Sequence, residues 1–292
     1  MDVPTAAGLA LGAAADLALG DPRRGHPVAG FGGLATALER RVWRDSRPMG
    51  AAYAVALTAA AAAAVTWTVL GGTSLGRAAG RMHAALDSGD LDAARRALPA
   101  LAGRDPDSLD AAGLTRATVE SVAENTSDAA VAPLFWGAVA GIPGLVAYRA
   151  VNTLDAMVGH RSSRYHRFGW AAARTDDVAN VVPARVTAAL TVACAPLART
   201  SASGALRAWR RDGAAHPSPN AGRCEASMAG ALGVRLGGRN VYGGRVEHRP
   251  ALGDGRPPVA DDVLRAIRLS RAVWLAAAAL ASVVRLARRA AA

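Results

Sequence analysis

The stretch ESVAENTSDAAVAPLFWGAVAGIPGLVAYRAVNTLDAMVGHR, residues 120–161, decides the fold of this chain, because acids and amides flank an apolar run. The run itself, residues 131–151, is about as long as a helix that spans the hydrocarbon core of a membrane. Gly141, Pro143 and Gly144 interrupt it, which indicates a kink or a re-entrant hairpin. Acidic side chains at a membrane edge are costly, so those beside this run are candidates for function.

The composition of the whole chain is that of a membrane protein. Of its 292 residues, 51% are hydrophobic and 20% are charged, which is more apolar than a typical soluble domain. We expect an all-α, polytopic integral membrane protein with polar loops rich in Gly and Arg. Residues 1–292 are interpreted as one membrane domain, in which residues 200–268 are a candidate peripheral subdomain.

Apolar segments recur along the chain, but Ala supplies much of their apolar content and is only mildly apolar, which weakens each prediction from hydropathy. The positive-inside rule does not orient them, since every loop is rich in Arg. One active site that uses all the polar loops needs those loops on one side of the membrane. We therefore expect some apolar segments to be re-entrant or buried in protein. The candidate segments are residues 3–20, 49–70, 131–151, 181–197 and 274–286.

The net charge of +11 comes entirely from Arg, because the chain contains no Lys. A Walker P-loop and a Schiff base both need a Lys, so these two kinds of site are excluded. Any phosphate clamp must use Arg, backbone N–H groups or a metal ion. Few aromatic residues and no zinc pattern argue against nucleic acid as a partner. Cys194 and Cys224 lie far apart in sequence, and we expect them to be free buried thiols.

Three acids follow one another at helical spacing, namely Glu120, Glu124 and Asp128. Residues four apart share a helix face, so these carboxylates repel one another unless a positive group lies over them. Mg²⁺ would suit, because it binds carboxylate oxygens together with substrate phosphate. The alternative is a solvated acidic face, or one that pairs with Arg.

A second set of acids and amides follows the apolar run. Asn152 and Asp155 lie three residues apart, and Asp176, Asp177 and Asn180 come next. Carboxylates beside amides are suited to a magnesium–phosphate site. The alternative is helix capping, with Asp176 and Asp177 at the start of a helix.

Two loops supply further candidates. Asp21 and His26 lie in a Gly/Pro-rich loop, where His26 is a candidate general base or a structural residue. Residues 218–222, SPNAG, predict a helix start with Ser218 as N-cap, whose free N–H groups would bind an anion. The glycine pairs around residues 239–242 indicate either a phosphate loop or a hairpin.

Taken together, these motifs resemble the CobD/CbiB family of cobalamin biosynthesis. The similarity follows family order along nearly the whole chain, and the segment after SPNAG departs from it with Arg-Cys-Glu at 223–225. The motifs are GDP…HPV at 20–28, RD at 104–105, ESVAENTSDAAVAPLFW at 120–136, YRAVNTLDAMVGHR at 148–161, RYHRFGWAAARTDDVANVVPAR at 164–185, SPNAG at 218–222, GALGVRLGG at 230–238 and Tyr-Gly at 242–243.

The resemblance implies an adenosylcobinamide-phosphate synthase, a ligase that joins adenosylcobyric acid to (R)-1-amino-2-propanol or its O-phosphate. It implies ATP as cosubstrate, Mg²⁺, a multi-pass position in the cell membrane lipid, and other membrane-associated cobalamin-assembly enzymes as candidate partners. We expect the site on the cytoplasmic side. The alternative from another class is a non-catalytic membrane sensor or a transport component.

On this reading the acids and amides divide into roles. We assign the metal to Glu124, Asp128, Asp155 and Asp176, and the base to Asp177 or His26. Contacts to substrate or phosphate are expected from Asp21, Glu120, Asn125, Asn152, Arg161, Arg174, Asn180, Arg185, Ser218, Asn220 and Gly222.

Overall fold

The structure is a computed structural model that describes residues 2–19, 27–43, 46–159, 164–165, 167–242 and 245–290. Asp21, His26 and Arg161, three of the predicted site residues, lie outside these ranges. The described elements are helices with one antiparallel hairpin. They are α1 (Asp2–Leu19), α2 (Pro27–Val42), α3 (Arg47–Val69), α4 (Gly72–Asp87), α5 (Leu91–Ala97), η1 (Leu98–Ala100), η2 (Pro106–Ser108), α6 (Ala111–Thr126), the π-helical η3 (Ser127–Val131), α7 (Ala132–Val158), α8 (Trp170–Cys194), α9 (Ala202–Asp212), α10 (Ala221–Leu232), β1 (Leu236–Tyr242), β2 (Arg245–Leu252) and α11 (Ala260–Ala290).

Four stretches of helix in the described part are long and apolar enough to cross a membrane, which confirms the all-α membrane class. The predicted segments 49–70, 131–151 and 274–286 each fall inside one of them, and 181–197 overlaps another. The stretches are Arg47–Asp87, Ala111–Val158, Trp170–Cys194 and Ala260–Arg288.

The last helix is much longer than the sequence analysis predicted. Residues 274–286 cover only part of α11, which begins at Ala260 and has 31 residues. Its first half carries two acids and several arginines, which lowers its mean hydropathy. Val263, Ala266, Leu269 and Val273 repeat every three or four residues on the other face and are fully buried.

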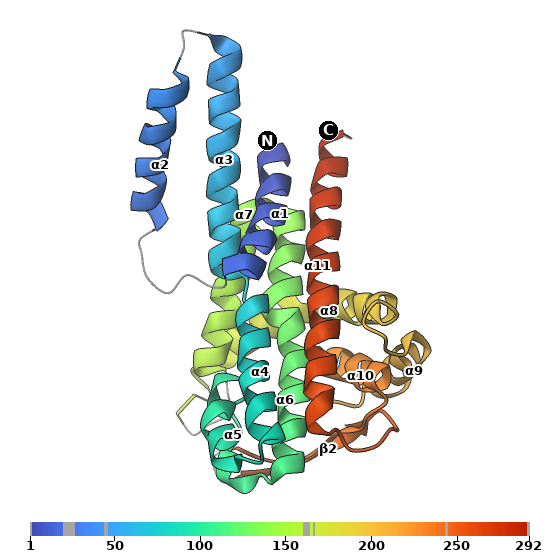
Figure 1. Cartoon of the computed structure of the whole chain (residues 1–292). Coiled ribbons are helices and arrows are strands. Elements are labelled where there is room, and N and C mark those ends of the chain that lie inside the picture. Colours follow the sequence, from blue (N-terminus) through green and yellow to red (C-terminus); the bar gives the residue numbers. More distant parts are fainter. Residues whose placement is uncertain are drawn as a thin grey trace.

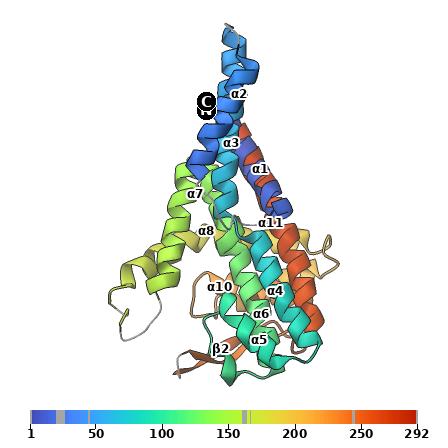
Figure 2. The same cartoon turned by 60° about the vertical axis from the view of Figure 1, so that its left-hand side comes forward.

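The elements divide into two ends along the long axis of the molecule (Figure 1). One end holds α1, α2, α3, the turn of α7 and the C-terminal half of α11, together with both chain termini. The other end holds α4, α5, the start of α6 and the hairpin of β1 and β2. Both views place α5 and the hairpin at the end away from the marked chain ends (Figure 2).

Helices α1 and α3 approach closely because α1 presents glycine at two positions four residues apart. A side chain at Gly8 would meet the Cβ of Ala62 at 2.3 Å, and one at Gly12 would meet the Cβ of Thr66 at 2.4 Å. Such small-residue seams are typical of helix packing in membranes.

The interruption predicted inside residues 131–151 is a reversal of the chain. Gly141 has φ 71° and ψ −162°, a conformation open essentially to glycine alone. A side chain at Gly144 would lie 2.6 Å from the carbonyl oxygen of Trp136, eight residues earlier. In a continuous helix eight residues span about 12 Å, so the two halves of α7 form a hairpin. Both polar flanks of the apolar run therefore lie at the same end of it.

Prolines within the helices leave carbonyl oxygens that no helical N–H can reach, because proline lacks the donor. In three places a group from another segment takes over. Pro133 leaves the carbonyl of Ala129, which accepts from Gly71 N at 2.9 Å. Pro143 leaves the carbonyl of Val139, which accepts from Arg288 Nη1 at 2.8 Å. Pro183 leaves the carbonyl of Ala179, which accepts from Trp136 Nε1 at 3.0 Å.

Residues 200–268, the candidate peripheral subdomain, contain α9, α10, the hairpin and the first residues of α11. Gly204 and Gly230 bring α9 and α10 together, since a side chain on Gly230 would touch the Gly204 carbonyl oxygen at 2.2 Å. The hairpin pairs β1 with β2 in antiparallel register, with Asn240 opposite Glu247. Of the two alternatives for residues 239–242, the hairpin is therefore correct.

Candidate active site

Four carboxylates predicted as metal ligands lie on three helical segments that the α7 reversal brings to one region. Asp128, in η3, is within electrostatic reach of Glu124, Asp155 and Asp176. Glu124 is exposed, and the other three are partly exposed. The region is therefore a shared acidic site that opens to solvent.

Hydrogen bonds fix the amides of this site. Asn152 Nδ2 donates to Asp176 Oδ1 at 3.4 Å, and Asn180 Nδ2 donates to Asp176 Oδ2 at 3.0 Å. The hydroxyl of Tyr148 donates to Asn180 Oδ1 at 2.9 Å, and Arg149 donates to Asn152 Oδ1 at 3.2 Å. Each amide thus orients Asp176 and is itself oriented by α7.

The capping alternative for Asp176 and Asp177 is wrong. Helix α8 begins at Trp170, six residues before Asp176, so both acids lie inside the helix. Asp177 pairs with Arg174 at 3.5 Å, and its backbone carbonyl accepts from Asn220 Nδ2 at 2.7 Å. These contacts tie the loop before α10 to the acidic site.

A buried ionic cluster lies one turn along α6 from Glu124. Glu120 is 2% exposed and forms an ion pair with Arg104, and its Oε1 accepts from the backbone N–H of Gly237 at 2.6 Å. A positive group does therefore cover this part of the acidic face, as the i, i+4 spacing required. Glu120 holds the hairpin against α6 and is too buried for direct contact with a large substrate.

His216 completes this cluster from the loop before α10. Arg249 Nη1 lies 2.6 Å from His216 Nε2, and Glu225 Oε1 lies 3.9 Å from the same atom. Burial, and secondarily the Arg249 guanidinium, lowers the pKa of His216 to about 4, so the ring is neutral near pH 7. Burial also raises the pKa of Glu225 well above its ordinary value.

The prediction of Ser218 as N-cap is wrong, because Asn220 is the N-cap of α10, and the helix start leaves less room for an anion than predicted. Ser218 Oγ accepts from the backbone N–H of Asn220 at 3.3 Å and of Ala221 at 3.1 Å, and α10 begins at Ala221. Two of the predicted free donors are therefore occupied. Gly222 permits close packing, because a side chain there would meet the Cβ of His216 at 2.4 Å.

The other residues predicted to contact substrate or phosphate bind partners on their own helices. Asn125 Nδ2 donates to Ser121 one turn earlier, and Arg185 Nη1 donates to the Val181 carbonyl at 2.6 Å. With Arg174 on Asp177, the described members of the predicted arginine clamp each have a partner on their own helix. Arg174 and Arg185 therefore do not share a partner in the described part of the chain.

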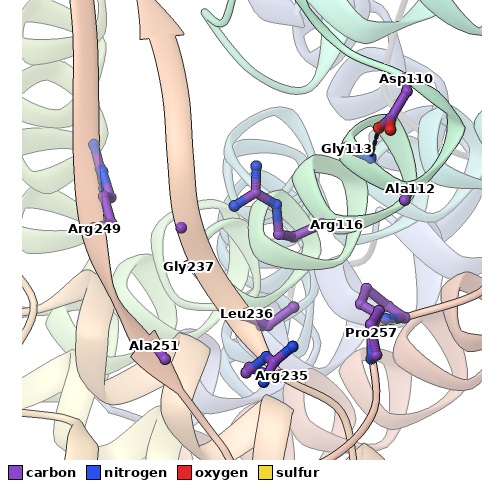
Figure 3. A pocket seen from close by; sticks show the side chains of 12 residues that line it. Asp110, Ala112, Gly113, Arg116, Arg235, Leu236, Gly237, Arg249, Ala251 and Pro257 are labelled. Atoms are coloured by element: carbon purple, nitrogen blue, oxygen red, sulfur yellow. Dashed lines mark hydrogen bonds between the residues drawn. The ribbon is translucent and has the colours of Figure 1, made fainter.

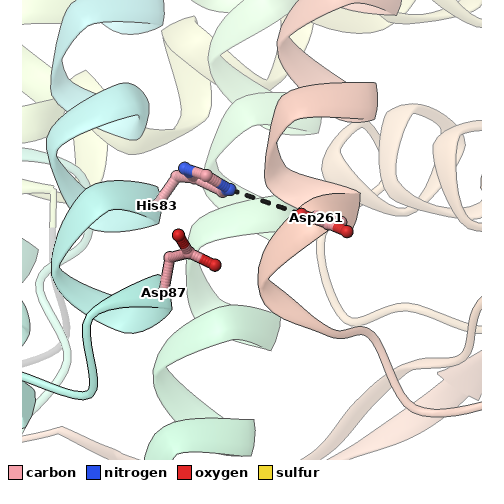
Figure 4. Close-up of side chains that lie close together, drawn as sticks. All are labelled: His83, Asp87 and Asp261. Carbon is pink, nitrogen blue, oxygen red and sulfur yellow. Dashed lines mark ion pairs between the residues drawn. The ribbon is translucent and has the colours of Figure 1, made fainter.

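Among the described residues, the metal-type donors that approach most closely as a group of three are elsewhere. His83 and Asp87 of α4 and Asp261 of α11 have ligand atoms within 4.8 Å of one another (Figure 4). The Asp261 side chain is 81% exposed and lies in the first turn of α11, where the helix dipole stabilises a negative charge. This group links α4 to α11 and lies on helices other than those of the acidic site.

Comparison with known proteins decides the family. A model of the family described as CobD/Cbib protein matches residues 9–270. The chain belongs to the CobD/CbiB family. It is 53% identical over 295 residues to the cobalamin biosynthesis protein CobD of Mycobacterium tuberculosis (strain CDC 1551 / Oshkosh), with 94% of each chain covered. No solved structure matches the chain.

More distant relatives of the CobD/CbiB family also match. A cobalamin biosynthesis protein CobD of Geobacter metallireducens is 45% identical, over 84% of this chain and 85% of its own. One from Rhodobacter capsulatus is 41% identical, over 88% and 90%.

Several residues of the candidate site were not predicted from the sequence, because their partners are distant in sequence. Arg104 belongs to a quoted motif, RD, but only the fold shows that it pairs with Glu120. Glu225 was noted as a departure from the family and is a buried neighbour of His216. The others, Tyr148, Arg149, His216 and Arg249, are single polar residues without informative spacing. Both thiols, Cys194 and Cys224, are free and buried as expected.

Proposed function

We propose that this chain is the membrane-bound ligase that joins the free propionate of adenosylcobyric acid to (R)-1-amino-2-propanol or its O-phosphate. Membership of the CobD/CbiB family supports a role in cobalamin biosynthesis. The observation that carries the enzymatic part is the acidic site, where Glu124, Asp128, Asp155 and Asp176 meet from three helical segments.

The donors of the acidic site fit Mg²⁺. They are carboxylate and amide oxygens, which this cation prefers, and Glu124 is open to solvent. Magnesium commonly uses one or two protein carboxylates and completes its shell with water and substrate phosphate, so a tighter cage is unnecessary. Glu124, Asp128, Asp155 and Asp176 would hold the ion, which supplies positive charge to the phosphates of ATP. Asn152 and Asn180 fix the orientation of Asp176.

The proposed reaction needs activation, because a carboxylate does not condense with an amine at neutral pH. A propionate oxygen attacks the γ-phosphorus of ATP, the bond to the β-bridging oxygen breaks, and ADP leaves. The amine then attacks the acyl carbon and inorganic phosphate leaves. Asp177, partly exposed beside the acidic site, would take the proton of the ammonium. His26 remains the other predicted base.

The site belongs on the cytoplasmic side of the cell membrane under this proposal, since ATP is available there. The apolar end of the molecule would lie in lipid, and the polar end would face the other enzymes of cobalamin assembly. A sensor or a transport component is the alternative. A transporter would place its acids mid-span, whereas these acids lie on the polar flanks of the apolar run, at the open end of the α7 hairpin.

Purified full-length protein, incubated with ATP, Mg²⁺, adenosylcobyric acid and each of the two amines, tests the proposal. The expected result is a corrinoid product whose mass equals acid plus amine minus water, with ADP released in equal amount. Product formation with one amine alone identifies the natural substrate. The absence of product with both amines would contradict the proposal.

A deletion strain tests the same proposal in the cell. It is expected to accumulate cobyric acid and to recover cobalamin synthesis when cobinamide is added. A strain that does not accumulate cobyric acid would favour the sensor or transport alternative.

A further inference from the structure

A small pocket of about 220 Å³ lies between α4 and α11, beside the end of α1 and outside the acidic site. Apolar side chains form much of its wall, among them Leu17, Ile267 and Trp274, and two arginines complete it, Arg77 and Arg271. The volume is below the range of pockets that enclose a whole small molecule. The pocket therefore suits a chemical group of few atoms that belongs to a larger ligand.

The two arginines of this pocket come from different helices. Arg77 lies in α4 and Arg271 in α11, and both are exposed. Neither forms a hydrogen bond or an ion pair with another residue of the described part of the chain. None of the described residues in the pocket wall is acidic. Two guanidinium groups are therefore available to an anion.

A larger pocket, of about 420 Å³, also contains arginines and differs in both respects (Figure 3). It lies between the start of α6 and the hairpin. Arg116 donates there to Asn240 Oδ1 at 3.2 Å, and Arg249 pairs with a neighbouring glutamate at 3.9 Å. The carboxylate of Asp110 lies in the same wall. Because these charges already have partners within the protein, the pocket between α4 and α11 is the better anion site.

The smaller pocket lies at the level where two apolar segments of the chain end. Residues 49–70 end just before Gly72, and residues 274–286 begin at Trp274. The two ends are in contact, because a side chain on Gly72 would lie 3.0 Å from the Trp274 ring. In a membrane this level is the boundary between the hydrocarbon core and the headgroups. Lipid headgroups are therefore within reach of the pocket.

The charges along the contact between α4 and α11 are separated by sign. The two helices pack side by side (Figure 1). At the end of the contact away from Trp274, His83 Nε2 lies 3.5 Å from Asp261 Oδ1. Arg271 follows Asp261 by ten residues, which is about 15 Å along the helix. This acid is too distant to pair with the arginine, so the positive charge lies at the lipid boundary and remains uncompensated by it.

We propose that this pocket binds the phosphodiester of an anionic phospholipid through Arg77 and Arg271. Guanidinium groups form charge-assisted hydrogen bonds with phosphate oxygens, and basic pockets between membrane helices bind acidic lipid headgroups. The acyl chains would extend from the pocket along the apolar half of α11. Leu275, which lies one turn after Arg271 on the same face, is 38% exposed and would contact them.

Native mass spectrometry of the full-length protein in a neutral detergent tests this inference. Delipidated protein is titrated with dioleoyl phosphatidylglycerol, which is anionic, and with dioleoyl phosphatidylcholine, which has no net charge. Inorganic phosphate is the third ligand and represents a soluble anion. Arg77→Gln and Arg271→Gln each remove one charge from the pocket. Arg268→Gln is the matched control, since Arg268 is exposed on α11 one turn earlier and is outside the pocket wall.

A second pair of variants changes the shape of the pocket and leaves its charge unchanged. Gly76 lines the pocket, and the nearest atom to a Cβ placed on it is Ile267 Cγ2, at an ordinary contact distance of 3.7 Å. Gly76→Leu would therefore fill part of the pocket. Gly80→Leu is its control one turn further along α4, because nothing lies within 4 Å of the added Cβ and Gly80 is outside the pocket wall.

We expect the wild-type protein to bind phosphatidylglycerol about tenfold or more tightly than phosphatidylcholine. Arg77→Gln, Arg271→Gln and Gly76→Leu should each raise the Kd for phosphatidylglycerol about fivefold, and the two controls should change it less than about twofold. Thermal unfolding in the same detergent establishes that each variant is folded.

Three results would overturn the inference. Equal affinity for the two lipids would show that the charge of the headgroup is not recognised. An equal loss in Arg268→Gln would indicate a diffuse attraction to the surface, and wild-type affinity in Gly76→Leu and both pocket arginine variants would exclude the pocket. Inorganic phosphate that binds as tightly as phosphatidylglycerol would assign the arginines to a soluble anion. None of these results depends on amide formation, so the lipid site and the proposed ligase are tested separately.

Discussion

Glu124 and Asp176 lie on different helices, and each is a carboxylate of the acidic site. Replacing either with its amide, in Glu124→Gln or Asp176→Asn, keeps the shape and removes one negative charge. We expect kcat/KM for ligation to fall by about 100-fold or more, and the Mg²⁺ concentration needed for half-maximal rate to rise. Steady-state rates over a Mg²⁺ titration measure both effects.

Asp92→Asn is the control for these two variants. Asp92 is 78% exposed on α5, where it pairs with Arg95 at 3.1 Å, so its removal leaves the acidic site intact. If Glu124→Gln and Asp176→Asn both retain wild-type rates and Mg²⁺ dependence, the metal assignment is wrong.

His216 makes stability depend on pH. The pKa of the folded protein's imidazole is lowered to about 4, below the ordinary 6.5, so the unfolded chain binds more protons between these values. The stability that His216 contributes is therefore complete above about pH 6.5 and is lost as the pH falls through 4. A shift of this size corresponds to about 3 kcal/mol. Glu225 acts in the opposite sense, since the pKa of its buried carboxyl is raised.

His216→Gln isolates the histidine contribution, because glutamine still offers Arg249 an acceptor. Thermal unfolding of the detergent-solubilised variant should lose less stability than the wild type between pH 6.5 and 4. His248→Gln, an exposed position in β2, should follow the wild type. A wild-type pH profile in His216→Gln would show that another group controls this range.

At the residue scale, charged residues that lie close together in sequence could be predicted. Those that come together only in the folded chain could not. Glu120, Glu124 and Asp128 repeat at helical spacing, and Asp155 and Asp176 stand beside amides in sequence, so all five were predicted. A second cluster brings together His216, Arg249 and Arg104 from three different segments. Because these residues are far apart in sequence, no local pattern predicts their contact. Tyr148 lay in an apolar run, where its hydroxyl gave no signal until Asn180 was placed beside it.

Helix packing can be tested at the glycines of α1. Gly12→Ala would force a methyl group against Thr66, whose Cβ lies 2.4 Å from the new atom. We expect a loss of about 1–3 kcal/mol, since this contact is with a packed helix. Gly80→Ala in α4 is the matched control, because nothing lies within 4 Å of its new methyl group. It should leave stability unchanged or raise it by about 0.5–1 kcal/mol.

Thermal unfolding of both alanine variants in one detergent measures the difference. A Gly12→Ala protein that melts at or above the wild-type temperature would show that α1 and α3 can separate without cost.

Elements were predicted best where hydropathy alone describes them. The apolar helices α1 and α3 were found with nearly their observed bounds. The first half of α11 was missed because its arginines mask the buried stripe that begins at Val263. The break in α7 was located at the right residues. Glycine and proline allow either a kink or a reversal, however, and only contacts such as that of Gly144 with Trp136 decide between them.

For the molecule as a whole, the α7 reversal decides which parts can meet. A straight α7 would carry Asn152 and Asp155 about 30 Å or more from Asp128, to the far side of a membrane. The hairpin instead returns them, and α8 then begins beside the acidic site. Arg288 from α11 satisfies the carbonyl of Val139 that Pro143 frees, so the last helix also stabilises the turn.

This arrangement predicts the sidedness of four exposed positions. Asp107 lies in the short helix η2, and Arg164 and Ala214 lie in segments between helices. Each is replaced singly with cysteine in the full chain. All three should react with a membrane-impermeant maleimide from the same side, which the proposed function makes the cytoplasmic one. Ala290→Cys, at the terminal end of α11, should react from the opposite side. Cys194 and Cys224 are buried, so they should contribute little background.

Labelling of intact cells and of inverted vesicles distinguishes the two sides. The decisive comparison is between Asp107→Cys and Arg164→Cys, because the α7 hairpin lies between them in sequence. A chain that crossed the membrane once through α7 would expose these two cysteines on opposite sides. That result would separate Asp155 and Asp176 from Glu124, and a single acidic site could no longer form.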